Sequence, residues 1–110
     1  TEQYQITRAE WLRDDRKYTD ALEVTDELIQ NDSTSVAAWM LKGRVLNDQY
    51  RYYSARDAFE KVVEYDSSNT IALQELEKLE KKIAYLRIQK QREENRRLID
   101  ELKPIERINQ

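Results

Sequence analysis

The groups in this sequence that are most able to do chemistry are its 22 aspartate and glutamate side chains. Paired carboxylates can act as general acid and base, but such a pair needs a shaped pocket that separates its two pKa values. With so many acids, neighbours such as Asp14 and Asp15 are unavoidable, and no spacing marks out a catalytic pair. There is no histidine and no cysteine, which removes the commonest general base, the commonest zinc ligand and a thiol nucleophile. Gly43 is the only glycine, so no glycine-rich loop can cradle a phosphate. The sequence therefore predicts no enzyme, no metal site and no cofactor.

The elements that position these side chains are expected to be helices. Pro104 and Gly43 are the only proline and glycine among 110 residues, and charged residues make up 37% of the chain. Scarce turn residues and abundant helix formers favour an all-α fold. No apolar run approaches the roughly 20 residues that span a bilayer, and no signal-peptide pattern opens the chain. We expect a cytoplasmic domain without membrane contact and, because it begins with Thr1 rather than Met, part of a longer protein.

A repeat of 34 residues runs through the first two thirds of the chain. When the sequence is compared with itself at this offset, identical residues recur at Leu12/Leu46, Asp14/Asp48, Tyr18/Tyr52, Ala21/Ala55, Asp32/Asp66 and Ser33/Ser67. These pairs fall where two packed helices and a turn would need them. The pattern therefore predicts an array of helix pairs, each of which buries its apolar face against the next.

The second unit shows the expected helix pair most clearly. A first helix is predicted from Val36 to about Asp48, in which Gly43 indicates the close approach of a neighbouring helix because glycine otherwise costs helix stability. A turn follows at 49–53, and a second helix is predicted from about Ser54 to Tyr65. Ser68 or Asn69 is expected to cap the next helix. The first unit places Trp11 and Leu12 on its first helix, and Ala21, Thr25 and Leu28 on its second.

These features resemble the tetratricopeptide (TPR) repeat. The resemblance rests on the 34-residue period, the Trp39–Gly43–Leu46 spacing, the tyrosine before each second helix, and the series Ala55, Phe59, Val62 and Asp66. It implies a right-handed superhelix of antiparallel helix pairs, with repeats at 2–35 and 36–69. The first repeat departs from the pattern at Gln5 and Ala9, and both repeats have a serine where the family prefers proline.

A long helix is predicted after the second repeat, because nothing interrupts a helix between Thr70 and Pro104. Residues 70–86 are expected to cap the array through an apolar stripe, residues 87–103 to form an overhanging basic helix, and residues 104–110 a tail. Residues 1–77 carry a net charge of −7 and residues 78–110 a net charge of +4. The stripe consists of Leu73, Leu76, Leu79, Ile83 and Leu86.

Three interpretations of the overhanging helix stay open. It is a solvated helix held by charge pairs such as Glu93–Arg97, a coiled coil, or a docking element that uses Leu98, Ile99 and Leu102. The apolar stripe covers fewer heptads than a coiled coil needs. Nucleic-acid binding is not expected, because no aromatic platform accompanies the basic residues and the rest of the chain is acidic.

By the resemblance, the first helix of each pair lines a groove that holds an extended peptide or a partner helix. An apolar strip with a positive end would favour a protein or peptide partner with an aliphatic and an acidic residue. The apolar strip is expected to consist of Ile6, Ala37, Met40 and Ile71, and the positive end of Arg44, Lys78 and Lys81; Gln3 is a further groove position. The residues expected to bind a partner are Ile6, Glu10, Arg13, Met40, Arg44, Asn47, Gln74, Lys78 and Lys81.

The TPR domains of co-chaperones hold acidic chaperone tails with a carboxylate clamp of Lys, Asn and Arg residues. The matching positions here are Ile6, Glu10, Leu41, Ile71 and Glu75, which lack those side chains. Clamp-type binding of chaperone tails is therefore disfavoured. The sequence favours a non-enzymatic adaptor acting through its groove, as part of a chaperone or other multiprotein assembly. The alternative is an assembly element whose C-terminal helix mediates docking or self-association.

Overall fold

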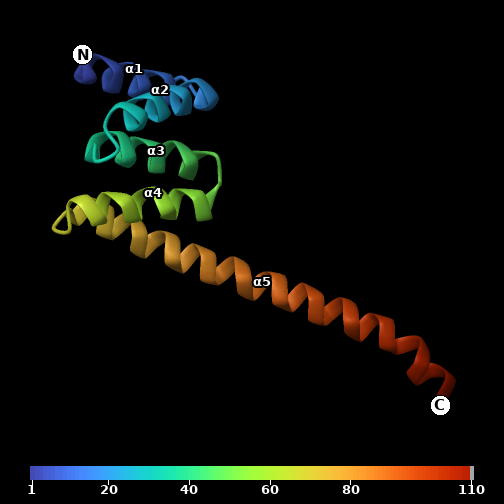
Figure 1. The fold of residues 1–110 in the computed structure, drawn as a ribbon. Helices are drawn as coiled ribbons and strands as arrows, with labels where there is room; N and C mark the ends of the chain where they lie inside the picture. Colours follow the sequence, from blue (N-terminus) through green and yellow to red (C-terminus); the bar gives the residue numbers. More distant parts are fainter. Residues whose placement is uncertain (110) are drawn as a thin grey trace. The chain divides into compact units, whose positions relative to one another are not determined.

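The computed structural model describes the backbone of residues 1–109 and the side chains of residues 1–103. Helices and short turns account for all of the described backbone, so the predicted all-α fold is confirmed (Figure 1). The chain divides into two compact units, Thr1–Glu80 and Lys81–Gln110. The helices are α1 (Glu2–Asp14), α2 (Tyr18–Asn31), α3 (Val36–Asp48), α4 (Tyr52–Tyr65) and α5 (Thr70–Asn109).

The 34-residue offset of the sequence reappears in the helix bounds. α3 begins and ends 34 residues after α1, α4 does so relative to α2, and α5 begins 34 residues after α3. The N-caps follow the same offset, because the side chains of Thr1, Ser35 and Asn69 accept hydrogen bonds from backbone amides three residues ahead, at 3.2, 3.3 and 3.0 Å. The prediction that Ser68 or Asn69 caps the third of these helices is confirmed for Asn69. The helix bounds and N-caps therefore recur with the same 34-residue period as the sequence.

The turns inside the two helix pairs are also equivalent. Arg16 and Tyr50 both adopt a left-handed backbone conformation, with φ of 59° and 62°. The amide that follows each of them donates back to a carbonyl five residues earlier, Lys17 to Leu12 at 2.8 Å and Arg51 to Leu46 at 2.9 Å. This Schellman closure ends the helix abruptly. It explains why α4 begins at Tyr52, two residues earlier than the sequence predicted.

The core of the first unit contains two clusters that together involve all of its helices. One consists of buried residues of α1, α2 and α3: Ala9, Ala21, Val24, Leu28, Ala38, Leu41 and Val45. The other consists of buried residues of α3, α4 and the start of α5: Met40, Leu46, Ala55, Ala58, Phe59, Val62, Ala72 and Leu79. Each helix of the unit therefore packs against its neighbours in the chain, as a stacked array requires.

Gly43 lies where the side chain of Phe59 on α4 packs against α3. A Cβ atom at this position would lie 2.8 Å from Cε1 and Cζ of Phe59, whose side chain is fully buried. The absence of a side chain thus lets the aromatic ring lie directly on the α3 backbone. The close helix approach predicted from this glycine is confirmed.

The start of α5 differs in part from the predicted capping stripe. Leu79 is buried in the second cluster and Leu76 packs against it, but Leu73 is 45% exposed. The helix also continues to Asn109, whereas the sequence predicted that it ends before Pro104. A proline within a helix removes one backbone hydrogen bond of the helix, and here this loss does not end α5. Within the described residues, no helix combines the length and apolarity that crossing a bilayer requires.

Candidate partner-binding surfaces

Helices α1 and α3 lie side by side and run in the same direction. At their N-terminal ends, the Ser35 hydroxyl donates a hydrogen bond to Glu2 Oε1 at 2.9 Å. At their C-terminal ends, Arg13 Nε donates to Asp48 Oδ2 at 2.6 Å, and its Nη2 lies 3.3 Å from Oδ1. Because both ends are tied in this order, residues that are 34 apart lie at the same height on the two helices. The predicted groove positions therefore form rows across α1 and α3.

One of these rows is charged. Glu10 on α1 is exposed and Arg44 on α3 is half-buried, and Lys78 occupies the equivalent position on α5. Arg44 forms no ion pair or side-chain hydrogen bond with any residue whose side chain the structure describes. Lys78 is paired only loosely, at 3.8 Å from Glu75. These two cations are the groove residues best able to meet an acidic ligand.

Arg13 is placed differently from the sequence-based expectation. Its two contacts with Asp48 form a bidentate ion pair that is about one-third exposed, and the hydrogen bond to Asp48 raises the pKa of the Arg13 guanidinium. A charged group held in this way is already satisfied within the chain. Arg13 therefore fixes α1 against α3. Asn47 is half-buried one turn after Arg44, beside a polar hollow of about 500 Å³ that Asp48 also lines.

The predicted apolar strip is narrower than expected. Met40 is only 8% exposed and belongs to the second core cluster, so it contributes to packing between helices and offers little surface to a partner. Ile6 is half-buried against the first cluster. Ala37 and Ile71 remain exposed, as do the polar residues Gln3 and Gln74. The strip thus consists of small or isolated apolar side chains among polar ones.

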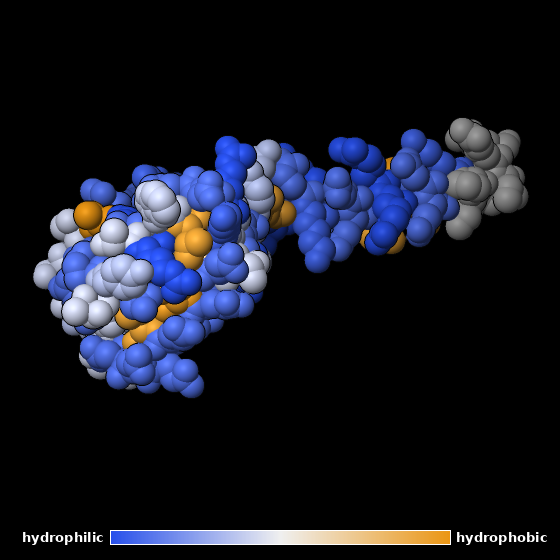
Figure 2. Space-filling view, turned by 90° about the horizontal axis from the view of Figure 1, so that it is seen from above, coloured by the Kyte–Doolittle hydropathy of each residue, from blue (hydrophilic) through white to orange (hydrophobic). Residues whose placement is uncertain are grey.

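The residues predicted on the C-terminal helix are exposed in the second unit. Leu98, Ile99 and Leu102 are 54%, 58% and 53% exposed, and their spacing of three and four residues places them on one side of the helix. In Figure 2 hydrophobic residues interrupt an otherwise hydrophilic surface along this helix. Lys81, the remaining residue predicted for the groove, belongs to this second unit.

A further exposed surface lies on α1. The sequence analysis did not predict it, although it placed Trp11 on the first helix. Trp11 is 79% exposed and Tyr4 is 64% exposed, both on α1. Their equivalents on α3, Val45 and Ala38, are completely buried. The 34-residue offset itself could have revealed this, because it aligns large aromatic residues with small core residues. We call Tyr4, Thr7, Arg8 and Trp11 the outer face of α1.

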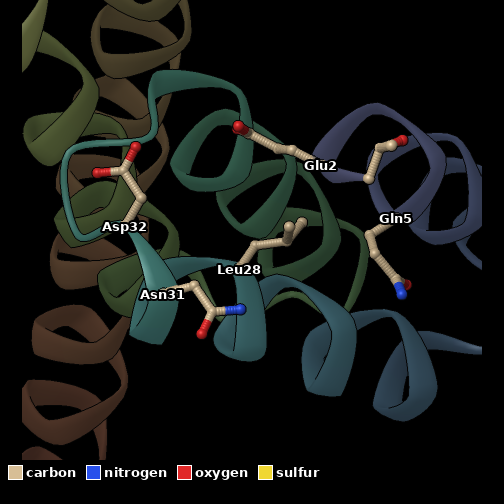
Figure 3. A pocket seen from close by; sticks show the side chains of 6 residues that line it. Glu2, Gln5, Leu28, Asn31 and Asp32 are labelled. Atoms are coloured by element: carbon tan, nitrogen blue, oxygen red, sulfur yellow. The ribbon is translucent and has the colours of Figure 1, made fainter.

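The hollow in Figure 3, of about 340 Å³, lies between the start of α1 and the end of α2. Glu2 and Gln5 border it on one side, and Leu28, Asn31 and Asp32 border it on the other. Glu2 already accepts the hydrogen bond from Ser35, and Asp32 accepts two from Thr34. Within the described side chains, no group of three or more acidic residues is placed to hold a metal ion. The hollow therefore lacks the convergent set of free polar groups that would hold a ligand.

Comparison with known proteins does not assign a function to these surfaces. No family model matches this chain, and no curated protein matches it.

Proposed function

We propose that this chain is a protein-interaction domain of the tetratricopeptide type. It holds a short peptide across the helices α1, α3 and the first part of α5, whose equivalent positions are related by the 34-residue offset. The observation that carries the proposal is the charged row of Glu10, Arg44 and Lys78 on helices of which the first two are parallel. Arg44 is half-buried without an acidic partner among the described side chains, and a partly desolvated cation gains most from an anionic ligand.

The expected ligand is an extended peptide with an acidic residue and an aliphatic residue near it. The acidic residue would lie against Arg44 and Lys78, and the aliphatic one against Ile71 and Ala37, which are the exposed apolar residues of the groove. Glu10 would disfavour a second acidic residue at the α1 end of the peptide, because like charges in proximity repel.

The test is selection from a displayed library of random 12-residue peptides. The wild type should enrich acidic-aliphatic sequences, and the double variant Arg44→Glu/Lys78→Glu should enrich basic sequences. The matched control is Arg51→Glu/Lys61→Glu, which changes the net charge equally but alters residues of the α3–α4 turn and of α4. Circular dichroism would verify that both variants fold.

Inversion of the selected charge in the groove variant, together with an unchanged selection by the control, would support the proposal. The proposal would fail if the wild type enriches no sequence, or if both double variants enrich the same peptides as the wild type.

A second candidate function is assembly through the C-terminal helix. It is favoured by the exposure of Leu98, Ile99 and Leu102 on one side of that helix. Sedimentation equilibrium would test it, since Leu98→Gln/Leu102→Gln should abolish any self-association of the wild type. A wild type that remains monomeric at high concentration would exclude self-association through this surface.

A further inference from the structure

One side of α5 in the second unit is symmetric in the types of its side chains. Residues spaced three and four apart share a side of a helix. From the N-terminal to the C-terminal end, this side carries two apolar residues, two amides and two apolar residues, all of them exposed: Ala84, Ile88, Gln91, Asn95, Leu98 and Leu102. The order is the same in both directions about residue 93. We call these six residues the symmetric face of α5.

The two amides at the centre of this face limit what can cover it. Gln91 Nε2 donates a hydrogen bond to Asn95 Oδ1 at 3.1 Å, and no other partner of these two side chains is found among the described residues. Each carboxamide has further donors or acceptors to satisfy, and burying them under apolar groups would be costly. An element that covers the whole face must therefore bring polar groups to its centre and apolar residues to both sides.

The same face of a second copy, laid antiparallel, meets this requirement. Reversal about residue 93 places apolar residues against apolar residues and amides against amides. The resulting layers, each of which occurs twice, are Ala84 with Leu102, Ile88 with Leu98, and Gln91 with Asn95. Two identical surfaces can meet across a two-fold axis only if each is complementary to its own reversed image. The symmetric face has this property.

The charges at the edges of the face favour the antiparallel orientation over the parallel one. In antiparallel copies Arg87 lies opposite Glu101 of the second copy, and both side chains are exposed without an ion pair among the described residues. In parallel copies Arg87 would instead lie opposite Arg92 of the second copy, because facing edge residues are then five positions apart. The antiparallel pair has a cost of its own, since Arg92 and Glu94 each lie opposite their own copies.

We propose that α5 pairs with α5 of a second copy, antiparallel, through the symmetric face. The central amides Gln91 and Asn95 fix the register, as single polar residues in the core of paired helices do at some cost in stability. This inference rests on the second candidate function, assembly through the C-terminal helix, and adds the partner, the orientation and the register. It does not depend on the peptide groove. A dimer of this kind carries two first units, so any ligand site on that unit is presented twice.

The first measurement is sedimentation equilibrium of the full chain at low salt over a range of concentrations. The wild type should show a monomer–dimer equilibrium. Arg87→Glu should weaken the dimer by about tenfold, because two attractive contacts become repulsive, and Arg87→Glu/Glu101→Arg should restore it. Glu94→Gln should strengthen the dimer, since it removes the repulsion between the two copies of Glu94. Lys90→Glu is the matched control, because Lys90 is exposed on the opposite side of the helix, and it should leave the dimer unchanged.

Distances between spin labels then measure the orientation. The chain has no cysteine, so Glu93→Cys and Asp100→Cys each provide a single labelling site. Both positions lie on the side of the helix that faces away from the contact. In the antiparallel pair the two labels at position 93 are at the same height, whereas those at position 100 are displaced along the helix by about 21 Å. The distance between labels should therefore be clearly longer at position 100 than at position 93.

The possible contrary results separate this inference from the function on which it rests. A wild type that stays monomeric would overturn both. A dimer that Leu98→Gln/Leu102→Gln leaves intact would assign self-association to another surface and would also overturn both. A dimer that Arg87→Glu strengthens or leaves unchanged, or equal label distances at the two positions, would overturn the antiparallel pairing, while assembly through the C-terminal helix would stand. Circular dichroism would verify that every variant remains helical.

Discussion

The contact between Gly43 and Phe59 leads to a prediction that can be worked out from the structure. In Gly43→Ala the new methyl group would lie 2.8 Å from two ring atoms and 2.9 Å from a third. Carbon atoms pack at about 3.5–4.0 Å, so the ring or the α3 backbone must move by about 0.7 Å. The ring is completely buried, so it has no open side toward which to move.

Two opposing effects set the magnitude. Alanine is about 1 kcal/mol more favourable than glycine in a helix interior. Overpacking of a core by one methyl group costs about 1–3 kcal/mol. Because the close atoms belong to a rigid, buried ring, we take the upper part of that range. Gly43→Ala should therefore lower the free energy of unfolding by about 1–2 kcal/mol, although it raises the intrinsic helix propensity.

The assay is urea unfolding followed by circular dichroism, applied to a double-mutant cycle with Phe59→Leu. In the Phe59→Leu background the clash is relieved while the helix propensity remains, so Gly43→Ala should become neutral or stabilising, with a coupling energy of about 1–3 kcal/mol. The control is Ala9→Gly at the equivalent position of α1, where the residue equivalent to Phe59 is Thr25. This substitution should destabilise by about 1 kcal/mol. A wild type stabilised by Gly43→Ala, or a coupling energy near zero, would refute the reasoning.

Three further predictions concern the turns and the ion pair. Asp48→Asn should lower the free energy of unfolding by about 1 kcal/mol at low salt and by less in about 1 M NaCl, since the partly exposed pair with Arg13 is screened; urea unfolding at both salt concentrations measures this. Arg16→Gly should raise the melting temperature through a gain of about 1 kcal/mol, because glycine adopts the observed φ of 59° without the strain of a side chain. The hydrogen bonds from the hydroxyl and the amide of Thr34 lower the pKa of Asp32. Its contribution to stability is therefore present above the ordinary pKa of aspartate and is lost as the pH falls through the lowered value. The free energy of unfolding of Asp32→Asn should therefore depend less on pH below about 4 than that of the wild type, as urea unfolding at several pH values would measure.

The sequence predicts the helices of this chain well because their signals are local. The recurrence of residues at 34 positions places the helix pairs, and Asn69 is recognisable as a cap from its own residue type and position. Gly43 predicts the close approach of α4, since a glycine inside a helix indicates that space is needed there. The ends of the helices are harder to predict from the sequence. Pro104 is a strong local signal for the end of a helix, yet α5 continues to Asn109.

The candidate sites are less predictable because they depend on neighbours that are distant in the sequence. Met40 matches a groove position of the resembling family, but the packing of α4 and α5 decides that it is buried. Arg13 looks available until the structure places Asp48 opposite it, 35 residues later. The exposure of Trp11 depends on whether a further helix lies against α1, which a pattern within one helix does not determine.

The two candidate surfaces of the first unit differ in chemistry, and this difference gives a way to separate them. The groove offers charges, Arg44 and Lys78, on helices whose exposed apolar residues are small or isolated. Affinity there should fall steeply with salt, because most of the attraction is between exposed charges. The outer face of α1 offers Trp11 and Tyr4 around a single cation, and burial of aromatic area is insensitive to screening. A ligand whose binding withstands high salt but is lost in Trp11→Ala therefore belongs to α1, and one that is lost in salt and in Arg44→Glu belongs to the groove.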